Sequence, residues 1–403
     1  MKDTLVASQI PRGFRFSATA CALKRAGQLD LGLIASDTPA AAAAVFTTNC
    51  VQAAPVQLSR GHLRRATSRM RAIAVNAGNA NCCTGADGLG AAQSTAAAVA
   101  RLLECRPEEI LVCSTGVIGV PLPVHRILAA LPRLVQSQAS GVHKFKRLCR
   151  AIMTTDTRPK WAAATYSVGR RTVRLLGCAK GAGMIAPNMA TLLGFIVTDA
   201  AIAPPLLQRA LREAVVASFN RITVDGETST NDTVAVLANG ASGARPINAV
   251  GGHYERFRSA LTAVCQRLAL SIVADGEGAQ RVIEIEVLGA PSVQAAERVA
   301  RAIAHSPLVK TACAGADPNW GRIMAAAGHS GVHFNPARAK ITLAGIEVFN
   351  GKPLPFDERS AHRKLSAPGI SIIMDLRSGK QRATLWTCDF TAKYVDINAS
   401  YRS

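Results

Sequence analysis

The chain has 403 residues, of which 49% are hydrophobic and 18% are charged, proportions typical of a folded globular protein and not of a disordered one. Lys and Arg number 47 against 26 Asp and Glu, and the net charge of +21 favours anionic partners such as nucleic acids, acidic membranes or acidic metabolites. No apolar run reaches the roughly 18 residues of a membrane-spanning helix, and the first residues lack the apolar core of a secretory signal. The sequence therefore predicts a cytoplasmic protein with no membrane partner.

Short apolar runs alternate with amphipathic stretches along most of the chain. In chain order, the apolar runs predict strands at Leu31–Ala35, Ala72–Asn76, Glu109–Ser114, Val173–Leu176, Leu192–Val197, Thr233–Leu237, Val282–Val287 and Ile370–Met374. The amphipathic stretches predict helices at Ala91–Glu104, Leu122–Val135, Leu206–Phe219, Phe257–Leu270 and Ser292–Ala304. Pro132 must kink or end the second of these helices. This mixture predicts an α/β or α+β fold of layered sheets and helices.

No change of composition marks a domain boundary, and Ala40–Ala44 is the one stretch with the low complexity of a linker. The 11 cysteines contain no C-x-x-C pair, and the adjacent Cys82 and Cys83 are too close in sequence to form an unstrained disulfide. The 8 histidines contain no H-E-x-x-H pattern. We therefore expect reduced, mostly buried thiols and no metal site.

Basic residues concentrate at positions 60–71, 143–150 and 158–174. These clusters lack interleaved aromatic residues, and the sequence contains no zinc finger or RNA-recognition signature. Solvated basic faces therefore explain them better than a specific nucleic-acid groove. A basic nucleic-acid-binding protein remains the alternative from a different class, and steep salt-dependent binding to DNA or RNA would identify it.

The loop before the predicted strand Leu192–Val197 reads KGAGMIAPNMAT and is the most informative part of the chain. Its residues Gly181–Ala186 match G-x-G-x-x-A, the phosphate-binding turn of dinucleotide folds, with Asp199 downstream. That turn should open a long helix, whereas Pro187 and the apolar run after it predict none. Dinucleotide binding is therefore the weaker interpretation.

The last two residues of this loop, Ala190 and Thr191, allow a different chemistry. If the Thr191 hydroxyl attacks the Ala190 carbonyl, the peptide bond becomes an ester, and water then releases an N-terminal threonine. The free α-amine of that threonine has an ordinary pKa of about 7.7 to 8.0, so it can act as general base for its own hydroxyl. Small residues before a strand are common, so this pair alone does not establish self-cleavage.

The wider pattern favours self-cleavage. Residues 180–200, KGAGMIAPNMATLLGFIVTDA, resemble the cleavage-site signature of the ornithine acetyltransferase family, the glutamate N-acetyltransferases of arginine biosynthesis. Further matches follow the family order: STGVIG at 114–119, MTTDT at 153–157, TVDGETSTND at 223–232, DGEG at 275–278, DPNWGR at 317–322 and INASYR at 397–402. The resemblance extends from about Pro11 to the last residue.

The resemblance implies an αββα-type layered fold and self-cleavage into an N-terminal chain, 1–190, and a C-terminal chain, 191–403. It implies that Thr191 is the nucleophile and that Thr115 and Gly116 form the oxyanion hole, which stabilises the charge that develops on the acetyl oxygen. The residues that it implies for substrate binding are Thr154, Lys180, Thr191, Glu277, Asn398 and Ser403. The Lys180 ammonium suits an α-carboxylate, and Glu277 suits a cationic group of the substrate.

The implied reaction transfers acetyl from N-acetylornithine to glutamate through an acetyl-Thr191 intermediate and requires no metal or other cofactor. Acetyl-CoA as a second acetyl donor stays open, because no motif separates family members that use it from those that do not. The implied assembly is a heterotetramer of the two fragments. A self-cleaving N-terminal-nucleophile aminopeptidase or amidase, which passes its acyl group to water, is the alternative within the same fold.

Three features depart from the family pattern. The chain ends in Ser403 where the family usually has threonine, Cys82-Cys83 stands where it has one cysteine or none, and the net charge is unusually positive. The acidic residues of 224–232 do not have the spacing of an EF-hand, and we interpret this segment as a structural loop near the site whose Thr and Asn side chains satisfy the backbone. Residues 319–322 receive no catalytic role.

Overall fold

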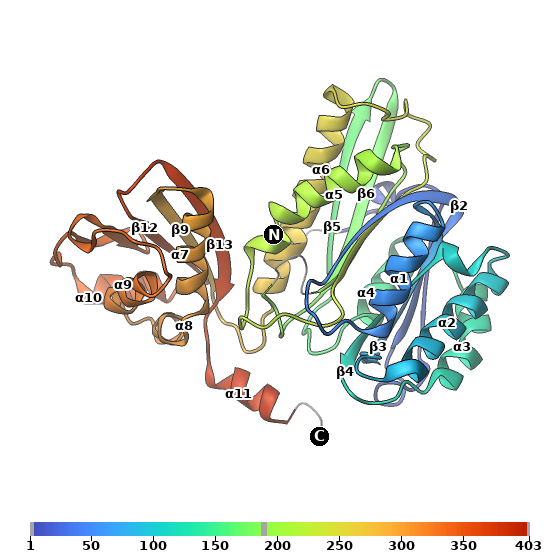
Figure 1. Ribbon diagram of the computed structural model, residues 1–403, viewed down its shortest axis with the longest axis horizontal. Helices are drawn as coiled ribbons and strands as arrows, with labels where there is room; N and C mark the ends of the chain where they lie inside the picture. The colour runs from blue at the N-terminus through green and yellow to red at the C-terminus, as the bar shows by residue number, and fades with distance from the viewer. Residues whose placement is uncertain (1–3, 187–191, 401–403) are drawn as a thin grey trace. The chain divides into compact units, whose positions relative to one another are not determined.

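The computed structural model describes residues 4–186 and 192–400, which form two compact units. The first unit comprises Met1–Gly181, Pro187–Asn220 and Thr228–Ile272, and the second comprises Ala182–Ala186, Arg221–Glu227 and Val273–Ser403. Figure 1 labels their helices and strands in chain order. The chain therefore passes between the units several times, which no composition change in the sequence predicts.

The first unit is built on one sheet of eight strands. They are β1 (Phe14–Thr19), β2 (Leu31–Phe46), β3 (Arg69–Asn79), β4 (Ile110–Val117), β5 (Lys160–Val168), β6 (Arg171–Lys180), β7 (Leu193–Thr198) and β8 (Thr233–Ala238). Their order is β4-β3-β2-β8-β7-β6-β5, with β1 paired to β2. The 16-residue β2 divides the sheet, because its first part pairs with β1 and β3 and its second part pairs with β8.

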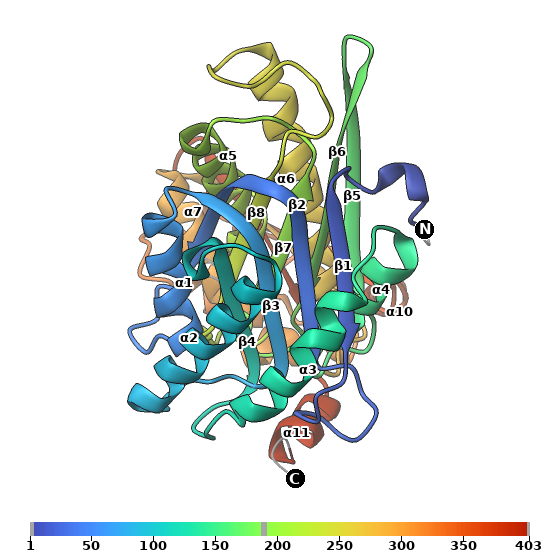
Figure 2. The same ribbon diagram turned by 90° about the vertical axis from the view of Figure 1, so that its right-hand side faces the viewer.

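The two halves of this sheet enclose a common core. Side chains such as Ile73 from the first half and Phe195 and Leu237 from the second belong to one buried cluster. The opposite face of the first half packs against α2 (Gly85–Leu102), beside β3 and β4, and α3 (Val124–Gln136), beside β1 and β2; Figure 2 shows both helices in front of these strands. At Gly177 in the second half, a Cβ would meet α6 (Gly252–Val273) 3.0 Å from Leu268. This helix–sheet–sheet–helix layering confirms the predicted αββα-type fold.

Ala40–Ala44, predicted as a linker-like stretch, is instead the middle of β2. Ala40, Ala42 and Ala44 lie in the core between the two halves of the sheet. The Gln208 side chain of α5 (Pro204–Val216) accepts from the Ala44 N–H at 3.3 Å and donates to the Ala44 carbonyl at 3.2 Å. A run of identical alanines hides the alternation that marks a strand, and the tertiary packing decides its conformation.

The predicted elements are all present, with different bounds. Each of the eight predicted strands overlaps a strand of the structure, although Glu109 and Leu192 fall just outside β4 and β7. Each of the five predicted helices coincides with a longer or shifted helix: α2, α3, α5, α6 and α7 (Val293–His305). Helix α3 does not end at Pro132 but continues to Gln136. Pro132 is exposed, so the carbonyl that lacks its N–H partner lies on the solvent side of the helix.

Several further elements carried too weak a pattern to be predicted. In the first unit these are β1, β5, α1 (Ala54–Arg65) and α4 (Val142–Ala151). In the second unit they are β10 (Lys340–Leu343), β11 (Ile346–Asn350), β13 (Gln381–Cys388), α8 (Pro307–Ala314), α9 (Trp320–Gly328), α10 (Glu358–Leu365) and α11 (Ala392–Ala399). Single 3-10 turns lie at Ala7–Gln9, Pro107–Glu109, Phe219–Arg221 and Pro336–Arg338.

The second unit holds a five-stranded sheet in the order β11-β10-β12-β9-β13, where β9 is Val282–Ala290 and β12 is Gly369–Asp375. Strands β9 and β12 are parallel, and the other pairs are antiparallel. Alternate residues of these strands, such as Ile285 and Ile372, are buried in a core that includes Val299 of α7 and Ile323 of α9. Burial of one sheet face under helices explains the alternating pattern that predicted β9 and β12.

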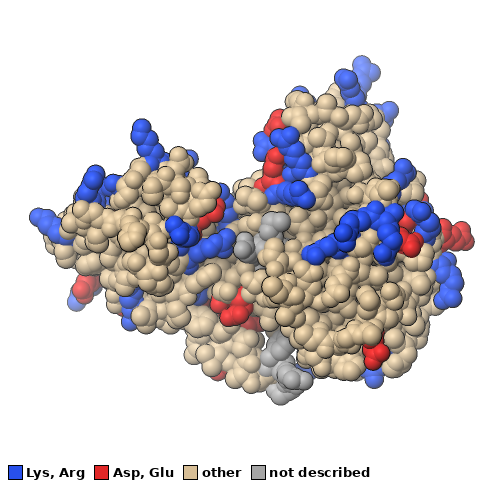
Figure 3. Space-filling view, viewed as in Figure 1, with Lys and Arg blue, Asp and Glu red and all other residues tan. Residues whose placement is uncertain are grey.

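The basic clusters lie on elements with one buried side. Helix α4 carries cluster 143–150, and it buries Phe145, Leu148, Cys149 and Ala151, while its basic side chains are exposed or half-buried. Helix α1 ends in His62, Arg64 and Arg65, where positive charge favours the carboxyl end of the helix dipole. On the face drawn in Figure 3, Lys and Arg side chains are dispersed and do not form one continuous stripe.

All 11 cysteines are free thiols, and the Cys82 and Cys83 sulfurs lie 3.8 Å apart. Across residues 4–186 and 192–400, no three His, Cys, Asp or Glu side chains gather as a metal site would require. Over the same residues, none of the helices combines the length and the apolar character needed to cross a bilayer.

Candidate functional site

Thr115 and Gly116 lie at the carboxyl end of β4, where β4 runs parallel to β3. Gly116 has φ +133°, and a Cβ at this position would overlap the backbone of Gly78 on β3. Only glycine fits here, because other residues would be strained both by the backbone angle and by the contact. The Thr115 side chain is buried, and its Oγ1 accepts a hydrogen bond of 3.1 Å from Lys180 Nζ.

Lys180 is the last residue of β6 and pairs in register with Leu193, the first residue of β7. The carbonyl of Leu192 accepts a 2.9 Å hydrogen bond from the Thr233 N–H at the start of β8. The chain therefore enters β7 beside Lys180. Strand pairing, and not sequence proximity, brings the end of β6, the start of β7 and the start of β8 together.

Asp156 organises the loop that carries Thr154. Its carboxylate accepts from the Thr154 N–H at 3.0 Å and from the Gly181 N–H at 2.7 Å, and it pairs with Lys160 Nζ at 2.5 Å. The Asp156 and Lys160 side chains are at most 1% exposed. Burial disfavours the ionised carboxylate, but the charges of Lys160 and Lys180 and the Gly181 N–H outweigh it and lower the pKa of Asp156 to about 2. Asp156 is therefore ionised throughout the neutral range and fixes Thr154 beside Lys180.

A second lysine lies in the same electrostatic environment. Lys24 Nζ donates to the carbonyls of Leu29 and Ala151 at 3.0 and 3.1 Å. Burial lowers the pKa of Lys24 to about 8; the nearby charge of Lys180 adds to this effect, and Asp30 and Asp156 oppose it. Lys24 is therefore a half-buried ammonium that lies among two carboxylates and a second lysine and is held by two backbone carbonyls.

The segment before β8 connects these parts. Asn231 Nδ2 donates to the Ser114 carbonyl at 2.9 Å and to the Ala80 carbonyl at 2.6 Å. The neighbouring Asp232 is buried, and burial raises its pKa well above the usual range, although Ser229, Lys180 and the Leu192 N–H oppose the shift. Burial therefore favours the neutral form of the Asp232 carboxyl, next to the start of β7.

The second unit holds Glu277 and Asn398. Asn398, on α11, donates from Nδ2 to Glu277 Oε2 at 2.7 Å and to the Tyr394 carbonyl at 3.0 Å. The Glu277 N–H donates to the Ala182 carbonyl at 2.9 Å. A Cβ at Gly183 would overlap the Glu277 carboxylate, so glycine allows the 182–186 segment to pass directly beside it.

Asp225 fixes the rest of that segment. Its carboxylate accepts from the N–H groups of Met184 at 2.6 Å and Ile185 at 2.9 Å. The Tyr394 hydroxyl donates to the same carboxylate at 3.3 Å. Burial, followed by the charges of Asp225 and Glu277, raises the pKa of Tyr394, so its hydroxyl stays protonated. Residues 181–186 are irregular and open no helix, so the G-x-G-x-x-A match does not form a dinucleotide-binding turn.

A sequence profile of the ArgJ family matches residues 15–403. The chain belongs to the ArgJ family. A relative from Symbiobacterium thermophilum, named arginine biosynthesis bifunctional protein ArgJ, is 48% identical over 98% of both chains. One of the same name from Chlorobium chlorochromatii is 50% identical over 98% of this chain and 91% of its own.

The solved structure of an ArgJ protein from Bacillus halodurans is 42% identical, with a TM-score of 0.50. That solved chain is matched over 98% of its length and covers 51% of this chain. The predicted resemblance to the ornithine acetyltransferase family is therefore confirmed.

The structure brings the predicted site residues of the ArgJ chain into two groups. Thr115, Gly116, Thr154 and Lys180 lie together in the first unit, and Glu277 bonds to Asn398 in the second. Ala190, Thr191 and Ser403 lie outside the described residues. The site contacts that the sequence did not predict are those of Lys24, Asp156, Lys160, Asn231 and Asp232. Asp156 belongs to the MTTDT motif at 153–157, and a charged residue within such a short motif could have indicated that it takes part in the site.

The segment 224–232 was predicted as a structural loop whose Thr and Asn side chains satisfy their own backbone. Within it, Asn231 Nδ2 instead reaches the carbonyls of Ala80 and Ser114, and just before it Thr223 Oγ1 donates to the Ile185 carbonyl at 2.9 Å. These side chains do satisfy backbone groups, but groups far away in sequence. The segment therefore joins distant parts of the chain, which local sequence reasoning could not indicate.

Proposed function

We propose that this ArgJ chain cleaves itself between Ala190 and Thr191 and then transfers acetyl from N-acetylornithine to glutamate through an acetyl-Thr191 intermediate. As a member of its family, the chain is an acetyltransferase of arginine biosynthesis. The observation that carries the finer proposal is the Lys180–Thr115 hydrogen bond of 3.1 Å beside the glycine-only position Gly116. It unites a cation, a hydroxyl and a closely packed backbone at the ends of β4 and β6, beside the start of β7.

In the first step, the Thr191 hydroxyl attacks the Ala190 carbonyl carbon, and the peptide bond becomes an ester with a free Thr191 amine. Water then hydrolyses the ester, which leaves residues 1–190 with a carboxylate and residues 191–403 with an N-terminal threonine. The new α-amine accepts the hydroxyl proton in the next step, since its ordinary pKa of about 7.7 to 8.0 suits a base near neutral pH.

In the transfer, Thr191 Oγ attacks the acetyl carbon of N-acetylornithine, and ornithine leaves after its nitrogen receives the proton. The amine of glutamate then attacks the acetyl-Thr191 ester, N-acetylglutamate is released, and the proton returns to Oγ. Thr115 accepts its bond from the Lys180 ammonium, so its own hydroxyl hydrogen is available to an oxyanion. Removal of one such donor typically costs about 2.7 to 4 kcal/mol of transition-state stabilisation.

We assign the α-carboxylate of both amino acids to Lys180, with Thr154 held beside it by Asp156. Glu277 suits the side-chain amine of ornithine, and Asn398 orients the Glu277 carboxylate through their 2.7 Å hydrogen bond. Ser403 is assigned to the same substrate on the resemblance alone. The assignment needs no metal or cofactor.

The length of the solved relative supports the division of the chain. The Bacillus halodurans chain covers 51% of this chain although 98% of its own length is matched. A precursor divided at Ala190/Thr191 gives fragments of about that size. We propose that the fragments 1–190 and 191–403 remain associated as a heterotetramer in the cytoplasm. An assay with acetyl-CoA in place of N-acetylornithine tests whether acetyl-CoA is a second acetyl donor.

The decisive experiment is the intact mass of the purified protein under denaturing conditions, beside Thr191→Ala. We expect two fragments with the boundary at Ala190/Thr191, and one chain of 42.2 kDa for the variant. Thr172→Ala, at an exposed position of β6, is the matched control and should cleave normally. An uncut wild-type chain would contradict the mechanism.

The cleaved protein is then assayed with N-acetylornithine, with and without glutamate. Formation of N-acetylglutamate supports the transferase, and the wild-type fragment that begins with Thr191 should gain the mass of one acetyl group. Release of free acetate at the same rate without glutamate would instead identify the amidase alternative. Salt-sensitive binding to DNA or RNA without any acetyl transfer would identify the nucleic-acid-binding alternative.

A further inference from the structure

A cavity of about 250 Å³ lies in the first unit, away from the residues described above. Its lining residues are Arg15, Ala35, Ser36, Asp37, Arg71, Leu102, Leu103, Glu104 and Gln138. Arg71 stands near the start of β3, whereas Ala77 near the end of β3 pairs with Thr115. Six residues of strand separate these positions by roughly 20 Å, so the cavity is distinct from the proposed active site.

Three buried polar atoms of this cavity have no hydrogen-bond partner among the described residues: Ser36 Oγ, Arg71 Nε and Gln138 Oε1. Ser36 is 2% exposed. Buried polar groups in folded proteins are nearly always hydrogen-bonded, because an unpaired one loses its bonds to water without replacement. The concentration of three such atoms around one cavity indicates that something other than this chain's own side chains bonds to them.

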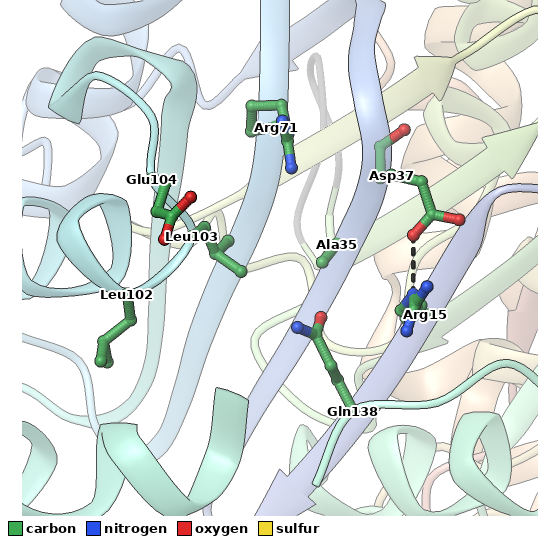
Figure 4. A pocket seen from close by; sticks show the side chains of 9 residues that line it. Arg15, Ala35, Asp37, Arg71, Leu102, Leu103, Glu104 and Gln138 are labelled. Carbon is green, nitrogen blue, oxygen red and sulfur yellow. Dashed lines mark hydrogen bonds and ion pairs between the residues drawn. The ribbon is translucent and has the colours of Figure 1, made fainter. Parts of the chain in front are cut away.

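The charges of the cavity are arranged in opposite pairs. Arg15 Nε and Asp37 Oδ1 form an ion pair of 2.7 Å at the exposed rim. The other two charged residues of the lining are Arg71 and Glu104, and neither makes an ion pair within the described part of the chain. Figure 4 shows Arg71, Glu104 and Gln138 reaching from three different elements toward the same space. Glu104 does so with φ +52° just after α2, a backbone conformation that favours glycine.

We infer that this cavity binds a free amino acid, with its carboxylate toward Arg71 and Ser36 and its ammonium toward Glu104 and Gln138 Oε1. An unpaired guanidinium N–H and a hydroxyl require an acceptor, whereas an amide oxygen and a carboxylate require a donor. A simple anion would leave Gln138 Oε1 unpaired and face Glu104, and a simple cation would face Arg71. A ligand with both charges offers a partner to each of these groups, with its ammonium at the exposed Glu104.

The size of the cavity agrees with such a ligand. Drug-sized molecules occupy pockets of roughly 300 to 1,000 Å³, and this cavity of about 250 Å³ lies below that range. Leu103 and Ala35 supply apolar wall between the charged groups. The apolar wall and the few polar groups form a metabolite-sized site, and its orientation would be fixed by the two charges.

The test measures binding of glycine, glutamate and lysine by calorimetry to a Lys180→Ala protein, because glutamate would also occupy the proposed active site. Acetate and methylammonium serve as single-charge controls. We expect saturable binding of at least one amino acid and none of either control. Ser36→Ala should weaken that binding about tenfold without loss of stability, since it removes a hydroxyl that has no partner in this chain.

Arg71→Met should abolish the binding, and Arg69→Met, an exposed position two residues earlier on β3, should leave it unchanged. Ser36→Ala keeps the test informative if Arg71→Met fails to fold. The inference is overturned if none of the three amino acids binds at about 10 mM, a limit that already corresponds to very weak affinity. Binding that survives both Ser36→Ala and Arg71→Met would overturn it equally, as would binding of acetate or methylammonium alone.

Discussion

The two groups of proposed site residues differ in how the protein holds them. In the first unit, Thr115 and Lys180 stand at strand ends, and the ion pair that orders the adjoining loop is completely buried. In the second unit, Asn398 is exposed on α11, a helix with no buried residue. The first group is therefore fixed by sheet pairing and a buried charge, whereas Asn398 in the second group depends on single hydrogen bonds such as that to the buried Glu277.

This difference indicates separate tasks. Oxyanion stabilisation requires donors that do not move during the reaction, and strand ends provide such rigidity. Substrate entry and release require groups that can give way, and a short exposed helix provides them. We therefore expect substitutions in the first group to affect stability and catalysis together, and substitutions in the second to affect substrate binding alone.

Asp156→Asn should have the largest effect on stability. It keeps the shape of the side chain but removes the negative charge that faces the buried Lys160 ammonium, a loss that typically costs about 3 to 5 kcal/mol. Urea unfolding measures the change. The double variant Asp156→Asn, Lys160→Met should recover much of it, and a single variant as stable as wild type would show that the pair does not hold the first group.

Gly116→Ala should have the second-largest effect on stability. The φ of +133° and the overlap with the Gly78 backbone predict a loss of about 2 to 3 kcal/mol in the free energy of unfolding, together with loss of acetyl transfer. Gly119→Ala is the matched control: it shares a positive φ, +79°, but a Cβ there meets nothing within 4 Å. We expect this control to cost about 1 kcal/mol and to retain activity. Equal effects of the two changes would argue against a tight β3–β4 contact at Gly116.

The stability of the first group should depend on acid pH. The pKa of Asp156 is about 2 in the folded protein and about 3.9 when unfolded, so the unfolded chain takes up the proton first as pH falls. The contribution of about 2.6 kcal/mol is therefore complete above about pH 5 and is lost progressively between pH 5 and 2. Over this window the free energy of unfolding of wild type should fall, relative to that of the Asp156→Asn, Lys160→Met variant, by about this amount. Parallel curves would contradict the assignment.

Asn398→Ala should have the smallest effect on stability. Its side chain is exposed, so we expect less than about 1 kcal/mol, within the usual range for surface positions. If Asn398 orients Glu277 toward the substrate, KM for N-acetylornithine should rise about tenfold with little change in kcat. Asp396→Ala on the same helix is the control. A fall in kcat without a change in KM would mean that Asn398 acts in catalysis, like the first group, and would contradict the proposed division of tasks between the two groups.

Much of the fold could be predicted because burial imposes a visible period. The alternation of Val282–Val287 and the amphipathic pattern of Ser292–Ala304 both correspond to elements with one buried face. The alanine run of β2 had no period to see, and short segments such as β10 and β11 were below the length at which a period is informative. The site residues were predicted by family motifs, but Asp156 and Asn231 were not, because their partners lie far away in sequence.

The sequence by itself determined the family and the layered fold class, and it proposed Thr115, Gly116 and Lys180 as site residues, because long motifs and hydrophobic periods are written in consecutive residues. Only the tertiary structure decided that Lys180 bonds to Thr115, 65 positions earlier, and that Asp156 ties Thr154 to Gly181. It alone revealed the cavity around Arg71. The physical reason is that strand order and helix packing bring together side chains whose separation along the chain carries no signal of their contact.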